Sequence, residues 1–151
     1  PAHIEAHHPD LFWYAVHGVE TLFTIMGTGC VSVQRTFTED TDLVVGVWDD
    51  KRIGTFRGIR KGQGGYGVSV FGETGIAVLN EYGGYEPLLV KVCEFFESGQ
   101  APIPIEETLE IFAFMQAADE SKKLGGKPVE MAPLMKEAKS KGLASLKSKL
   151  T

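Results

Sequence analysis

The chain has 151 residues, of which 43% are hydrophobic and 23% charged, as is ordinary for a globular protein with one buried core. Its formal charge of −5 gives no reason to expect a nucleic-acid partner, and no apolar run approaches the roughly 20 residues that span a bilayer. We therefore expect one domain that binds neither nucleic acid nor membrane, and without a secretory signal we favour the cytoplasm unless a signal lies upstream of Pro1.

The first nine residues, PAHIEAHHP, predict a loop. His3 and His7 are four residues apart, a spacing found in zinc sites. The segment lacks the full H-E-x-x-H pattern, however, and Pro9 ends it. A flexible or substrate-facing loop is therefore favoured over a metal site.

The next segment, residues 10–26, predicts an amphipathic helix with a wide apolar face. Asp10 suits its N-cap or first turn. The opposite face lacks Lys and Arg and instead carries aromatic, imidazole and acidic side chains. These are Asp10, Trp13, Tyr14, His17 and Glu20.

His17 has two interpretations. It is either a core histidine bonded to Glu20 three residues later, or a group for proton transfer. A neutral imidazole beside an acid is what general acid–base catalysis needs near neutral pH. The row of polar side chains around His17 keeps the second interpretation open.

Residues 30–82 alternate apolar with polar or small residues and predict four to six strands joined as an antiparallel meander. Within them, residues 62–67 read GQGGYG and formally match the dinucleotide fingerprint. That fingerprint requires a strand that turns into a helix. Because both neighbouring segments alternate like strands, a glycine-rich hairpin loop is predicted instead. Arg57, Arg60 and Lys61 are interpreted as solubilising charges at a hairpin edge.

Helical spacing returns in residues 85–100 and 105–126, and residues 127–131 predict a short strand or extended segment. The lysine-rich tail, with Leu143, Leu146 and Leu150 at helical spacing, predicts a solvated terminal helix; membrane-surface binding is the alternative. Cys30 and Cys93 lack a CxxC spacing and are interpreted as buried free thiols. The predicted class is α+β, with one open, mainly antiparallel sheet and helices on one face.

The segment YAVHGVETLFTIMG resembles the start of the C-terminal domain of the Gfo/Idh/MocA oxidoreductases, where a helix carries a histidine followed three residues later by an acid. The segment EETLEIFAFMQAADESKKLGGKPV is similar to the closing helix of that family. The resemblance covers residues 6–131. It implies a two-domain enzyme whose N-terminal Rossmann domain binds NAD or NADP, with hydride transfer to or from a sugar or cyclitol carbinol.

The same resemblance implies roles for individual residues. His17 corresponds to the proton-relay histidine, and Glu20 to the acid that follows it. Many members place Asp four residues before the histidine; Trp13 stands there, which leaves Tyr14 as the polar neighbour of His17. The Rossmann unit and the E-K-P catalytic lysine are absent, and Lys127-Pro128 is not their equivalent.

We therefore expect residues 1–131 to form a substrate-binding and oligomerising domain, and residues 132–151 a lysine-rich tail. The predicted catalytic residues are His17 and Tyr14. The predicted substrate contacts are Asp10, Trp13, Glu20 and His8. Expected partners are a polyol or sugar, the missing Rossmann domain and, through the sheet, a second copy. No cofactor or metal is expected in this chain. The alternative is a standalone, non-catalytic binding or dimerisation module.

Overall fold

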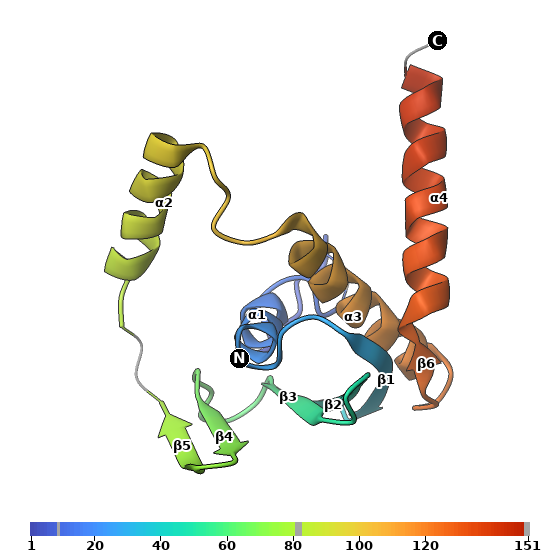
Figure 1. The fold of residues 1–151 in the computed structure, drawn as a ribbon. Coiled ribbons are helices and arrows are strands. Elements are labelled where there is room, and N and C mark those ends of the chain that lie inside the picture. Colours follow the sequence, from blue (N-terminus) through green and yellow to red (C-terminus); the bar gives the residue numbers. More distant parts are fainter. Residues whose placement is uncertain (9, 81–82, 150–151) are drawn as a thin grey trace.

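The computed structural model describes residues 1–8, 10–80 and 83–149, with side chains as far as residue 141. The fold is α+β, as the sequence predicted, and its elements follow the chain as drawn in Figure 1. They are α1 (Ala15–Met26), β1 (Cys30–Phe37), β2 (Thr41–Trp48), β3 (Ile53–Ile59), β4 (Val68–Gly72), β5 (Gly75–Leu79), α2 (Glu86–Ser98), α3 (Ile105–Lys123), β6 (Val129–Glu130) and α4 (Met131–Lys149).

The main sheet has the strand order β3-β2-β1-β6, and every pair in it is antiparallel. The predicted meander is confirmed for β1 to β3, and the short strand predicted at residues 127–131 is confirmed as β6. The prediction is wrong for β4 and β5, which form a separate hairpin. A long glycine-rich link, in place of a two-residue turn, joins β3 to β4, so no tight turn sets the two strands in register.

Helices α1 and α3 cover one face of the sheet. The strands alternate, so that Val33, Val44 and Phe56 are buried beneath these helices. A tilted and edge-on group of aromatic rings fills the centre of the core: Phe23, Trp48 and Phe114. The predicted apolar face of α1 is confirmed, because Ala15, Val19, Leu22 and Phe23 are all buried.

One glycine makes this close packing possible. A Cβ atom on Gly46 would lie 2.7 Å from the Phe114 ring and 2.8 Å from the Trp48 ring. Any larger residue at this position of β2 would therefore displace the Phe114 and Trp48 rings from their packed positions.

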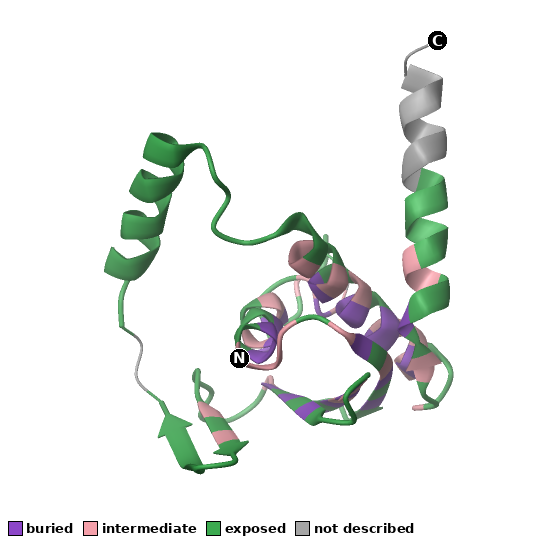
Figure 2. Cartoon of the chain, viewed as in Figure 1, coloured by how far each residue is buried: buried purple, intermediate pink, exposed green. Residues whose placement is uncertain are grey.

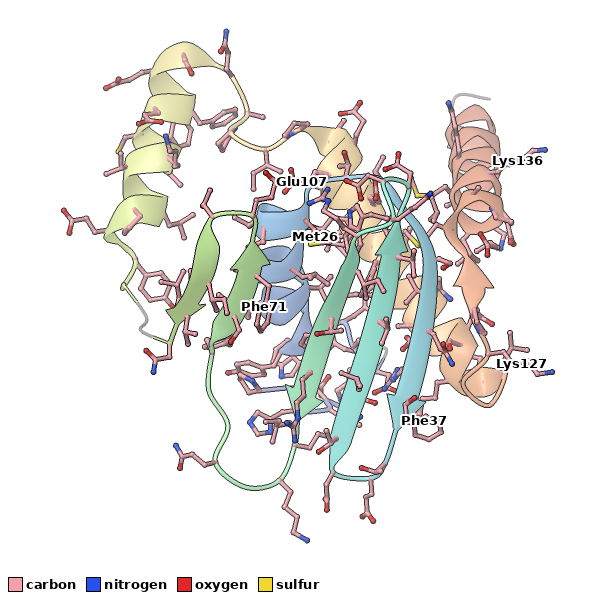
Figure 3. All side chains as sticks on the ribbon, turned by 60° about the horizontal axis from the view of Figure 1, so that its bottom comes forward. Met26, Phe37, Phe71, Glu107, Lys127 and Lys136 are labelled. Atoms are coloured by element: carbon pink, nitrogen blue, oxygen red, sulfur yellow. The ribbon has the colours of Figure 1, made fainter. Side chains whose placement is uncertain are left out.

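None of the described helices lies over the other face of the sheet. Figure 3 shows the strands in front and α1 and α3 behind them. Leu43 and Ile53 are exposed on this face, and Val45 and Val47 are half-buried. This arrangement agrees with the prediction of helices on one face.

Residues 68–98, called the arm below, extend away from the core. Figure 2 shows β5 and α2 entirely exposed. The helical spacing predicted for α2 is confirmed, but its apolar side chains are not buried. Their burial would need a surface that the described residues do not supply in this arrangement.

Three further local predictions need correction or qualification. The first helix begins at Ala15, because residues 10–14 form turns and Tyr14, not Asp10, is the N-cap.

Cys30 is buried, and burial followed by the charge of Glu110 raises its pKa to about 12, but Cys93 is exposed. The tail is helical as predicted, while the side chains of Leu143, Leu146 and Leu150 lie outside the described residues. None of the described helices combines the length and the hydropathy needed to cross a membrane.

Candidate functional site

Six rings meet along the exposed side of α1 and form what we call the aromatic row: His3, His8, Trp13, Tyr14, His17 and Tyr66. The ring centroids of Tyr14 and His17 are 6.5 Å apart, and those of Trp13 and Tyr14 5.8 Å. His8 lies 4.5 Å from Trp13, and His3 5.7 Å from Tyr14. The structure thus brings four of the six predicted site residues together in one group.

His17 is a surface residue, since its side chain is 56% exposed, so the interpretation as a core histidine is wrong. Its Nδ1 atom lies 3.1 Å from Oε2 of Glu20, as the spacing predicted. An ionised carboxylate only accepts hydrogen bonds, so a neutral imidazole in this pair carries its proton on Nδ1. That tautomer leaves Nε2 as a free base, able to take a proton from a bound hydroxyl.

Two members of the row, His3 and Tyr66, were not among the predicted site residues. Tyr66 belongs to the glycine-rich segment 62–67, and its ring lies 6.2 Å from that of His17. Burial, together with the neighbouring Tyr14 and Tyr85, raises the pKa of Tyr66, so its hydroxyl stays a hydrogen-bond donor at neutral pH. A lone aromatic residue in a glycine-rich loop was the available signal.

The N-terminal loop is fixed to strand β3 at one end and is closed on itself by a second contact. The Ala2 amide donates to the Ile59 carbonyl oxygen over 3.0 Å, and Ala2 is buried against the core. His8 Nδ1 lies 2.6 Å from Oε2 of Glu5, which lowers the pKa of Glu5. Among the described residues, no three His, Cys, Asp or Glu side chains converge as a metal site.

Asp10 is placed elsewhere, in a group of charges of which two are buried and four half-buried. We call it the ion network: Asp10, Arg35, Asp42, Arg60, Asp119 and Lys122. Arg35 is at its centre, with a side chain that is 0% exposed. Its guanidinium donates to Asp42 over 2.8 Å, to Asp119 over 2.8 Å and to Asp10 over 2.9 Å. None of the contacts between described residues joins Asp10 directly to His17.

The outer members of the network complete its charge balance. Arg60 is paired with Asp42, which corrects its interpretation as a solubilising charge, whereas Arg57 and Lys61 are exposed as predicted. Lys122 donates to Asp10 over 2.5 Å and lies 5.0 Å from the centre of the Phe37 ring. Three cations thus face three carboxylates, as burial of charge requires. An open depression of about 560 Å³ lies beside the network, lined by Asp10, Phe37, Asp119, Lys122 and Lys123.

The pKa values of the two carboxylates next to this depression are shifted in opposite directions. Burial would raise the pKa of Asp10, but the Lys122 hydrogen bond and the charges of Arg35 and Lys122 outweigh it and lower the pKa. Burial prevails at Asp119 and raises its pKa despite Arg35. Acidification therefore affects the two carboxylates differently: Asp10 keeps its charge to a lower pH than an ordinary aspartate, and Asp119 loses its charge at a higher pH.

We expect the Asp10→Asn variant to lose less stability than the wild type as the solution is acidified. A folded pKa below the unfolded value contributes stability that is present above the unfolded pKa and lost as pH falls through the folded one. Urea unfolding between neutral pH and pH values below the ordinary aspartate pKa measures this slope. Asp40→Asn is the matched control, because Asp40 is exposed. Equal slopes for wild type and Asp10→Asn would contradict the prediction.

The chain matches no protein-family model, no curated protein and no solved structure. Function must therefore be argued from the site itself and from the sequence resemblance.

Proposed function

We propose that this chain is the substrate-binding and oligomerising domain of a two-domain, NAD- or NADP-dependent oxidoreductase that acts on a hydroxyl of a sugar or cyclitol. The observation that carries the proposal is the exposed His17, with Glu20 on Nδ1 and Nε2 free, inside the aromatic row. An acceptor nitrogen among exposed rings suits a ligand that offers both hydroxyl groups and apolar C–H faces.

The aromatic row accounts for substrate binding in this proposal. The C–H face of a pyranose or cyclitol ring packs on an aromatic face, while its hydroxyls bond to polar groups at the ring edges. Trp13 and Tyr14 are both exposed and supply such surfaces. Glu20 orients the imidazole of His17, and the Tyr14 and Tyr66 hydroxyls add donors beside it.

The cofactor is assigned to the preceding domain, because the described part of this chain forms no cradle for a dinucleotide. Residues 62–67 lead into strand β4 and not into a helix N-terminus, so they do not fit a pyrophosphate. The chemistry that NAD or NADP supplies in such a protein is hydride exchange with the carbinol carbon. A lysine outside this chain would polarise the substrate hydroxyl, and His17 would relay its proton.

Oligomerisation is assigned to the open face of the main sheet. Ile53 is 65% exposed there, Leu43 is also exposed, and both lie on neighbouring strands. An apolar sheet face without a covering layer is a frequent interaction surface. The same face favours the alternative function, a standalone dimerisation module without chemistry.

A fluorescence titration of this chain with simple polyols tests the substrate class. Of the two tryptophans, Trp13 is exposed in the aromatic row and Trp48 is buried. We expect a saturable change in tryptophan emission with a cyclitol or monosaccharide, weak because half of the active site is missing. Tyr14→Ala should weaken the response, and Trp13→Phe should abolish it. A panel of polyols that leaves the emission unchanged would contradict the assignment.

A further inference from the structure

The arm poses a physical problem that the proposed function does not solve. Helix α2 has 13 residues, a length at which an isolated helix is marginal in water, and the β4–β5 hairpin alone is no more stable. None of the α2 residues is buried. At about 100° per residue, one half of the helix carries all but one of its apolar side chains: Leu88, Leu89, Val92, Cys93, Phe95 and Phe96.

A groove of about 300 Å³ lies on the opposite side of the core, at the base of α4. Its apolar lining consists of Cys30, Val31, Met131, Ala132 and Met135, and Glu110 and Glu130 border it. Glu110 is already bound to the amides of Gly29 and Cys30, both over 2.7 Å. Methionine side chains adapt their shape, which makes such a groove a suitable receptor for an apolar helix face.

The charges of the two helices are complementary. On α2, Lys91 is bound to Glu94, which leaves Glu86 and Glu97; on α4, Lys141 is bound to Glu137, which leaves Lys136 and Lys139. Among the described residues none of these four forms an ion pair. An acidic helix without a partner and a groove at the foot of a basic helix thus occur on one chain.

We propose that α2 of one copy docks in the α4-base groove of a second copy, and that the second copy returns the same contact. Figures 1 and 3 place α2 and α4 on opposite sides of the core, so the contact forms between copies and not within one. Two reciprocal contacts close a two-fold dimer. The inference rests on the proposed homo-oligomer and gives it a second contact beside the sheet face.

Sedimentation velocity of the 151-residue chain over a concentration series tests this contact. We expect a monomer–dimer equilibrium whose dissociation constant rises about tenfold or more in Phe96→Glu and in Leu89→Glu. Phe96 is 79% exposed and Leu89 60%, so neither change disturbs the fold of the monomer. Val90→Glu adds the same charge to the polar half of α2 and should leave the dissociation constant unchanged.

A mixing experiment separates a direct contact from an indirect effect. Met135→Lys, at the groove, should weaken self-association as Leu89→Glu does. An equimolar mixture of the two variants should regain it, because one wild-type contact and one Glu–Lys contact then form. In addition, oxidation of the Met135→Cys variant should join that position to the exposed Cys93 of the other copy.

Each contrary outcome overturns the docking proposal. These outcomes are a chain that stays monomeric at every concentration, a dimer unaffected by Leu89→Glu and Phe96→Glu, a mixture that fails to associate, and a disulfide from position 135 to Cys93 of the same chain. If Ile53→Lys alone dissociates the dimer, the sheet contact stands and the helix contact does not. Because no polyol is present, the result is independent of the substrate class.

Discussion

Replacing Arg35 with methionine should lower the free energy of unfolding by about 3–5 kcal/mol, the usual cost of removing one partner from a buried ion pair. Arg35 is completely buried and donates to Asp42, Asp119 and Asp10. Without it, Asp42, also completely buried, keeps only Arg60 as a cationic partner. Methionine retains much of the side-chain volume, so the loss reports on charge more than on packing.

Urea denaturation, followed by tryptophan fluorescence, measures this loss through the midpoint at unchanged slope. Arg57→Met is the matched control, because Arg57 is exposed on β3 and a surface change of this kind shifts stability by about 0.5 kcal/mol or less. The double variant Arg35→Met/Asp42→Leu should recover part of the loss, since it also removes the buried carboxylate that has lost Arg35 as its partner. A loss for Arg35→Met no greater than that of the control would contradict the central role of Arg35.

If the protein is the two-domain oxidoreductase proposed above, replacing His17 with alanine in it should reduce kcat by about 10²-fold or more, the contribution typical of a general acid–base group. His17 is exposed, so the variant should keep the unfolding midpoint of the wild type. Glu20→Gln, which keeps a hydrogen bond to Nδ1 but removes the charge, should have a smaller effect.

The control for this experiment is His7→Ala, because His7 is exposed in the same loop as His8 and none of the ring contacts described above includes it. Steady-state rates with the polyol identified by titration, measured at saturating cofactor, give kcat and KM separately. If His17→Ala turns over at the wild-type rate, the proton role is wrong and the standalone module becomes the better description.

Much of the fold could be predicted, because local pattern determines it. The 3.6-residue period of α1 and the alternation of β1 to β3 each appear in the sequence and each recur in the structure. The ion network could not be predicted in this way. In the sequence, Arg35 is one more polar residue in an alternating strand. Its partners Asp10 and Asp119 are 25 and 84 residues away. Periodicity carries no information about such pairs.

The same distinction between local pattern and distant contacts applies to the candidate site. Tyr14, His17 and Glu20 lie within two turns of one helix, so their proximity follows from helical geometry. Tyr66 reaches His17 from a loop after β3, and the path of a glycine-rich loop depends on tertiary contacts. The interpretation of Asp10 as the N-cap of the first helix was wrong. Its side chain is bound to Arg35 and Lys122, and Tyr14 is the N-cap.

The span of the ion network also bears on how the chain folds during synthesis. The hairpins β1–β2 and β2–β3 are local and can form early, but the face that holds Val33, Val44 and Arg35 is covered in part by α3, which is synthesised after all three of these strands. Until Asp119 has been synthesised, Arg35 lacks one of its three carboxylate partners, and this face of the sheet lacks the cover that α3 provides. A contact between residues so distant in sequence costs more loop-closure entropy than a local hairpin does, which delays its formation. The nascent chain therefore exposes part of the apolar face of this sheet until α3 has been synthesised, and only then can the native core be completed.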